Sequence, residues 1–143
     1  MTANLLSASV SSVFVLLALW HFYMALAPSS GKSGTIPSVG GKPLFVPSTK
    51  ATVAVAIVLL LFAALVAATA GFLPLGVPKV ALVWLCYALA LGLLARAIGE
   101  FRYVGFFKKV RGSRFATLDT FVYSPLCLLL AAGVAIVATQ NRP

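Results

Sequence analysis

Four long apolar runs dominate the chain, and shorter segments that hold most of the charged residues separate them. The runs lie at residues 5–27, 52–73, 80–99 and 116–139. Each is about as long as the ~20 residues that a helix needs to cross the hydrocarbon core of a bilayer. A helix also satisfies its backbone hydrogen bonds within one segment, as the lipid interior requires. The pattern predicts an all-α protein, a transmembrane four-helix bundle in a single membrane domain over residues 1–143.

The connections between the runs predict how the helices pair. "GFLPLGVPK" after the second run is short and rich in turn residues, so we expect the second and third helices to be an antiparallel pair. The first run ends in "ALA", which is similar to a signal-peptide cleavage site, but no Lys or Arg precedes it and Pro28 follows. We therefore expect it to be a retained helix.

Composition and charge placement predict the membrane topology. The chain is 62% hydrophobic and 9% charged, whereas soluble domains are about a quarter charged. The basic residues behind the net charge of +9 lie mainly in the loops at 28–51 and 100–115. Because this placement is typical of the loops of a membrane protein, we expect no nucleic acid as a partner. The positive-inside rule predicts cytoplasmic loops there, both termini on the non-cytoplasmic side, and a bacterial cytoplasmic membrane location. Nine cations lie on that side, against Lys79 and Arg142 on the other: Lys32, Lys42, Lys50, Arg96, Arg102, Lys108, Lys109, Arg111 and Arg114.

The predicted topology brings the rare ionisable side chains to one end of the bundle. Arg96 and Glu100 are four residues apart, so a helix would place them on one face, and we expect Glu100 to neutralise and orient Arg96. Asp119 is expected near the start of the fourth helix, where Thr117 is a competing N-cap, and His21 about two turns inside the first. The candidate ligand-binding residues are His21, Lys50, Arg96, Glu100, Arg102, Tyr103, Asp119 and Tyr123.

Each candidate has an ordinary structural interpretation as well. Arg96 can extend to the interface and form an ion pair, and Tyr103 can belong to an aromatic belt. Their convergence favours a site, because ionisable groups within membrane spans are rare and costly. The basic surroundings predict a polar pocket for a lipid-like or anionic amphipathic small molecule, and contacts with anionic headgroups. "FRYVGFFKKVRGSRF" mixes aromatic and basic residues, which is typical of a segment along the headgroups.

Three segments carry a resemblance to a known family: "WHFYMALA", "GGKPLFVPSTKATVAVA" and "RAIGEFRYVGFFKKVRGSRFATLDTFVYSPLCL". They resemble a bacterial four-span membrane family known as domain-of-unknown-function family 3995. Met24 stands where that family is expected to have Trp, and Glu100 where Asp is more usual. The resemblance implies a small integral membrane protein, and it supplies no activity, ligand or catalytic residue.

Two other functions stay open at this point. The protein is alternatively a structural or accessory membrane subunit without a ligand, or a membrane enzyme that uses His21 with Glu100 or Asp119 as acid and base. Cys86 and Cys127 lie within apolar runs without metal-ligand spacing, so we expect small buried side chains there. We expect no metal and no cofactor, and assembly into a homo-oligomer stays open.

Overall fold

The structure, a computed structural model, describes residues 2–27 and 35–143. Four helical stretches in these residues are long and apolar enough to cross a membrane. They are α1 (Thr2–Leu26), α2 (Thr49–Thr69), α3 (Lys79–Ile98) and the stretch Arg114–Gln140. The predicted all-α four-helix architecture is thereby confirmed. A short antiparallel pair, β1 (Ser38–Val39) and β2 (Lys42–Pro43), is the one sheet in the described part. Lys32, one of the cations of the predicted first loop, lies outside the described residues.

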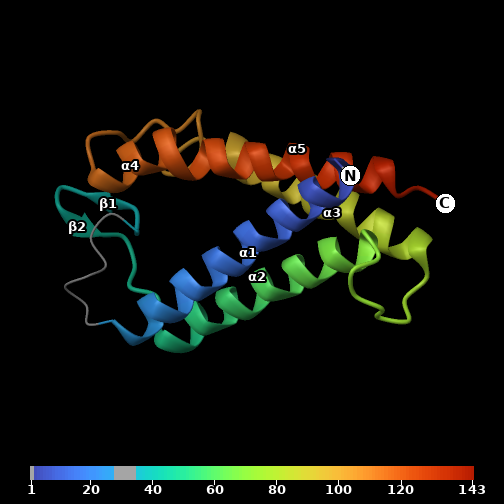
Figure 1. The fold of residues 1–143 in the computed structure, drawn as a ribbon. Coiled ribbons are helices and arrows are strands. Elements are labelled where there is room, and N and C mark those ends of the chain that lie inside the picture. The colour runs from blue at the N-terminus through green and yellow to red at the C-terminus, as the bar shows by residue number, and fades with distance from the viewer. Residues whose placement is uncertain (1, 28–34) are drawn as a thin grey trace.

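The helices form two antiparallel hairpins. α1 packs mainly on α2, and α3 packs mainly on α5 (Ser124–Gln140), while α1 also contacts α5 and α2 also contacts α3. The two hairpins meet near the chain termini and diverge toward the end that carries β1, β2 and α4 (Arg114–Leu118) (Figure 1). We call this the basic end, because Lys42, Lys50, Arg96, Arg102, Lys108, Lys109, Arg111 and Arg114 lie on or beside the connections there.

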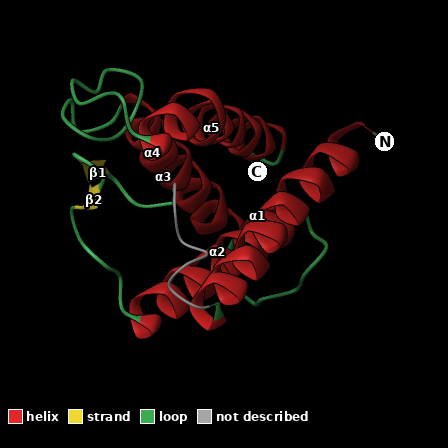
Figure 2. Cartoon of the chain, turned by 90° about the vertical axis from the view of Figure 1, so that its left-hand side faces the viewer, coloured by secondary structure: helices red, strands yellow, loops and turns green. Residues whose placement is uncertain are grey.

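The core lies between the hairpins, and the outer faces of the helices are apolar. Phe14, Val66, Cys86 and Val134 are fully buried where α1, α2, α3 and α5 meet. A Cβ on Gly133 would lie 2.8 Å from the side chain of Val10, so this glycine lets α5 approach α1 closely. Lipid provides no hydrophobic drive between helices, and small residues at such contacts supply close packing instead. The view along the bundle shows the hairpins as two separate helix pairs (Figure 2).

The fourth membrane-spanning helix contains an irregular turn. Ser113 is its N-cap, since its Oγ accepts a hydrogen bond of 3.0 Å from the N–H of Ala116, and Thr117 therefore lies inside the helix. The π-helical turn η2 (Asp119–Tyr123) then connects α4 to α5, with the N–H of Ser124 bonded to the carbonyl of Asp119. Pro125 follows directly and has no N–H, so the helix cannot form its regular hydrogen bond at this position. The wider π-helical turn lies next to this missing bond. Asp119 is the first residue of this turn.

The connection 99–113 is folded tightly against the end of α3. Gly99 ends that helix with φ 86°, and Gly105 has φ 91°, both in the left-handed region that favours glycine. Their backbones pack directly on each other. A Cβ on Gly99 would overlap the backbone of Val104 and Gly105, and a Cβ on Gly105 would overlap the backbone of Ile98 and Gly99. The N–H of Phe106 also donates to the carbonyl of Ala97 at 2.9 Å. This connection is therefore an ordered element with its own backbone contacts.

Gly105→Ala is expected to destabilise the fold strongly, whereas Gly112→Ala is expected to cost only the left-handed conformation, about 1–2 kcal/mol. Gly112 has a similar φ of 93°, but a Cβ there meets nothing within 4 Å. The free energy of unfolding in mixed micelles measures both. Equal losses for the two variants would contradict the close packing of Gly105 on Gly99.

Candidate functional site

The buried carboxylate of Asp119 is the centre of the polar structure at the basic end. Its side chain is 0% exposed and lies in the turn η2. Oδ1 accepts a hydrogen bond from Nη2 of Arg96 at 2.8 Å. Oδ2 accepts one from the N–H of Gly105 at 2.7 Å and one from Nζ of Lys108 at 3.0 Å. One carboxylate thus joins α3, the connection 99–113 and the fourth helix.

Lys108 is buried as completely as Asp119. It is 2% exposed, and its ammonium donates to Asp119, to the carbonyl of Gly105 at 3.0 Å and to Oγ1 of Thr120 at 2.6 Å. A lysine has three N–H donors, so its hydrogen-bonding capacity is used completely. We call Arg96, Gly105, Lys108, Asp119 and Thr120 the Asp119 cluster. It holds two cations and one carboxylate, which leaves one positive charge without a carboxylate.

The predicted pair of Arg96 with Glu100 is wrong. Arg96 forms its ion pair with Asp119, as Lys108 does, and Glu100 is exposed. The prediction assumed a helix through both positions. α3 ends at Ile98, however, and the left-handed Gly99 turns the chain before Glu100 is reached. The carboxylate that orients Arg96 comes from the fourth helix instead.

A cavity of about 410 Å³ lies between the diverging hairpins. It brings together three predicted site residues from three helical segments, His21, Arg96 and Tyr123. Trp20, Met24, Thr35 and Cys127 also reach it. The remaining walls are apolar and consist of Phe14, Leu17, Val55, Leu59, Leu93, Phe115, Leu126 and Leu130.

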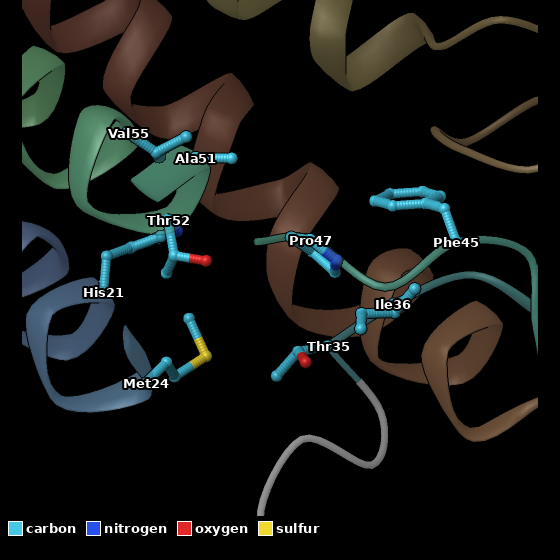
Figure 3. A pocket seen from close by; sticks show the side chains of 9 residues that line it. All are labelled: His21, Met24, Thr35, Ile36, Phe45, Pro47, Ala51, Thr52 and Val55. Atoms are coloured by element: carbon cyan, nitrogen blue, oxygen red, sulfur yellow. The ribbon is translucent and has the colours of Figure 1, made fainter. Parts of the chain in front are cut away.

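A second hollow, of about 310 Å³, adjoins this cavity. Both are lined by His21, Met24, Thr35 and Val55. Figure 3 shows the second hollow between α1 and the segment that leads into α2, with the ring of Phe45 at one side. The two hollows therefore lie side by side where the hairpins separate, and both are mostly apolar with a few polar residues in their walls.

The orientation of His21 is fixed by its own helix. Its Nδ1 lies 2.7 Å from the carbonyl oxygen of Leu17, and a carbonyl only accepts, so Nδ1 carries the proton. In the neutral ring the lone pair is then on Nε2. Asp119 is fully buried and bonded to three other donors, and Glu100 is exposed. Neither lines the cavity that His21 lines, so the predicted acid–base pair of His21 with Glu100 or Asp119 is not assembled in this arrangement.

Arg96 donates one hydrogen bond to Asp119 and has a second donor group without an acceptor. Its side chain is 36% exposed and lines the cavity, while its Nη1 is buried and has no hydrogen-bond partner. Two hydroxyl oxygens, of Ser11 and Ser124, share that state among the described side chains, but neither carries charge. A buried donor without a partner is costly, and more so when it is charged. Nη1 is therefore the polar group of this end that most lacks a partner.

The other predicted residues lie apart from the cavity. Lys50 is exposed in the first turn of α2, and the guanidinium of Arg102 lies 5.1 Å from the ring centre of Tyr103. Neither Lys50 nor Arg102 lines either hollow. Lys108, conversely, was not predicted, since nothing in "FFKKV" distinguishes it from Lys109. Within the described chain, no three His, Cys, Asp or Glu residues lie together in a way that could hold a metal ion.

Lys108→Met is expected to lower the free energy of unfolding by about 3 kcal/mol, because removing one partner of a buried ion pair leaves the other charge less compensated. Lys109→Met at the neighbouring exposed position is the matched control, with an expected change within about 0.5 kcal/mol. Denaturant titration in mixed micelles compares the two. A cost at Lys109 as large as at Lys108 would contradict the buried cluster.

The comparisons with known proteins agree with the family resemblance of the sequence. The family model described as "Protein of unknown function (DUF3995)" matches residues 14–134. No curated protein and no solved structure is similar enough to match the chain. The matched region includes the cavity residues of all four spans and the whole Asp119 cluster. The chain therefore belongs to the DUF3995 family, whose function is unknown.

Proposed function

We propose that this integral membrane protein binds one anionic amphipathic molecule between its two hairpins. The acidic head of the molecule contacts Arg96, and its apolar part lies in the adjoining cavity. The observation that carries this proposal is the side chain of Arg96, which is 36% exposed on the wall of an apolar cavity and keeps one donor, Nη1, without a partner in the fold. Arg96 contributes a guanidinium, which suits carboxylate and phosphate groups because its donors lie in one plane.

Charge balance supports an anionic head. Arg96 and Lys108 share one carboxylate, so the Asp119 cluster carries a net charge of +1. A charge without a counter-charge is costly at membrane depth, and a bound anion would offset that cost. Glu100 is exposed and does not supply the missing charge. A head with a single negative charge would balance the cluster.

The shape and lining of the space support an apolar tail. A cavity of about 410 Å³ falls within the usual range for small-molecule sites, roughly 300–1,000 Å³. Such sites are mostly apolar with a few placed polar groups, and here His21 and Tyr123 provide those groups beside Arg96. The adjoining hollow of about 310 Å³ extends the space along α1 and α2.

The side of the membrane follows from charge bias. Eight described cations lie at the basic end, and Lys79 and Arg142 lie at the other. The positive-inside rule places the basic end in the cytoplasm and both termini on the non-cytoplasmic side. In a bacterial cytoplasmic membrane, the ligand would then enter from the cytoplasmic leaflet. Lipids of that leaflet are one source of such molecules.

A structural or accessory role is the second candidate, and the completely bonded Lys108 favours it. The Asp119 cluster ties three segments together, as a purely structural element would. This interpretation assigns no partner to Nη1 of Arg96. An enzymatic role has less support, because His21 bonds its own helix rather than a carboxylate.

Arg96→Gln is expected to weaken binding of hexadecanoate about ten- to a hundredfold, since a hydrogen bond to a charged group contributes about 1.5–3 kcal/mol. Native mass spectrometry of the purified protein in mild detergent, titrated with deuterated hexadecanoate, measures the affinity. Hexadecanol, with the same chain and no charge, is expected to bind both proteins equally and more weakly than hexadecanoate binds the wild type.

Lys109→Gln is the matched control, because it removes an exposed cation from the same end and leaves the cavity unchanged. Asp119 keeps Lys108 and the N–H of Gly105 in the Arg96→Gln protein, and its unfolding transition checks that it is folded. The proposal fails if the wild type binds the acid no better than the alcohol. It also fails if Lys109→Gln weakens binding as much as Arg96→Gln does.

A further inference from the structure

Two phenylalanine side chains stand exposed in the connection 99–113, outside the membrane-spanning helices. Phe101 is 56% exposed and Phe107 is 63% exposed, and their ring centres are 6.3 Å apart. Phe101 follows the last residue of α3, Ile98, by three positions, so it lies within roughly 11 Å of the end of an apolar span. The two rings form an apolar surface next to the membrane boundary.

The backbone holds these rings outward. Phe101 has φ 65°, the one positive value among the non-glycine residues that the structure describes. Such a conformation is unfavourable for a bulky side chain and persists only where surrounding structure imposes it. Its carbonyl accepts a bond of 3.2 Å from the N–H of Lys109, and Lys108 is anchored on Asp119 from inside. The connection is thus fixed with Lys108 inward and Phe107 outward.

Exposed cations lie in the same connection as the two rings. Arg102, Lys109 and Arg111 are exposed, and Glu100 is the one exposed carboxylate of the described chain, so this surface has a net charge of +2. An exposed apolar turn at Phe72 lies at the opposite end, where Lys79 and Arg142 are the basic residues. Apolar rings among cations are typical of surfaces that enter the headgroup region of anionic membranes.

We propose that the connection 99–113 inserts Phe101 and Phe107 into the headgroup–acyl boundary of the leaflet at the basic end, where Arg102, Lys109 and Arg111 contact anionic phospholipid headgroups. Continuity with the apolar end of α3 favours lipid over a soluble partner protein as the occupant of this surface. The rigid backbone presents the rings without a folding step on contact. This surface is separate from the cavity, so the inference does not depend on the proposed ligand.

A photocrosslinking experiment tests this inference. The variant Phe107→p-benzoylphenylalanine is reconstituted into nanodiscs with equal amounts of phosphatidylglycerol and phosphatidylcholine and irradiated. Mass spectrometry of the intact protein then measures the adducts. We expect phospholipid adducts in which phosphatidylglycerol exceeds phosphatidylcholine at least twofold. Phe107 is chosen because its replacement leaves the left-handed Phe101 untouched.

The same replacement at Phe72 is the matched control. This residue is 48% exposed and follows the end of α2, so it is expected to form phospholipid adducts without a preference for phosphatidylglycerol. Neutralising Arg102, Lys109 and Arg111 together to Gln is expected to bring the ratio at position 107 to that at position 72. Absence of a lipid adduct at 107, adducts to a second copy of the protein, or equal ratios at the two positions would each overturn the inference.

Discussion

The structure at the basic end depends on keeping one carboxylate charged inside a membrane protein. Burying an ionised carboxylate costs several kcal/mol unless partners compensate it completely. Asp119 meets this requirement with a guanidinium, an ammonium and a backbone N–H. Those partners come from α3 and from the connection 99–113, so satisfying one side chain fixes the positions of both relative to the fourth helix. Gly105 donates its N–H to Asp119 and also packs on the backbone of Gly99, so one turn of the connection contacts both the carboxylate and the end of α3.

The divergence of the hairpins complements this arrangement. Nearer the termini, residues such as Val10 and Val137 fill the space between helices, and Gly133 allows α5 to approach α1. Toward the basic end, α3 and the fourth helix are held together by charge and hydrogen bonds, while α1 and α2 lead away from them (Figure 1). The polar contacts bind one hairpin to its own connection rather than to the other hairpin. A cavity between the hairpins is the result.

The membrane helices could be predicted from hydropathy because lipid leaves the backbone few alternatives. The site could be predicted in part: His21, Arg96 and Tyr123 share a cavity, as their placement at one end suggested. The partner of Arg96 could not, because the sequence does not show that Gly99 turns the chain before Glu100. Lys108 and Lys109 are equivalent in the sequence, and their opposite burial depends on a connection that only the tertiary structure defines. The N-cap of the fourth helix was not predicted either, because the sequence offers Thr117 as a suitable capping residue as well as Ser113.

The structural and ligand-binding interpretations concern the same residues. They differ in whether the positive charge that Asp119 does not compensate is balanced by a bound anion. A cluster that served the fold alone would be most stable if its charges were balanced, yet the chain provides two carboxylates and leaves one of them exposed. Asp119 therefore compensates one cation of its two. Lys108 uses all its donors within the fold, so the unbalanced charge resides on the side of Arg96, whose Nη1 has no partner. The same cluster thus secures the connection 99–113 and leaves a partly exposed guanidinium beside an apolar cavity, and this is the feature on which the proposal of an anionic ligand rests.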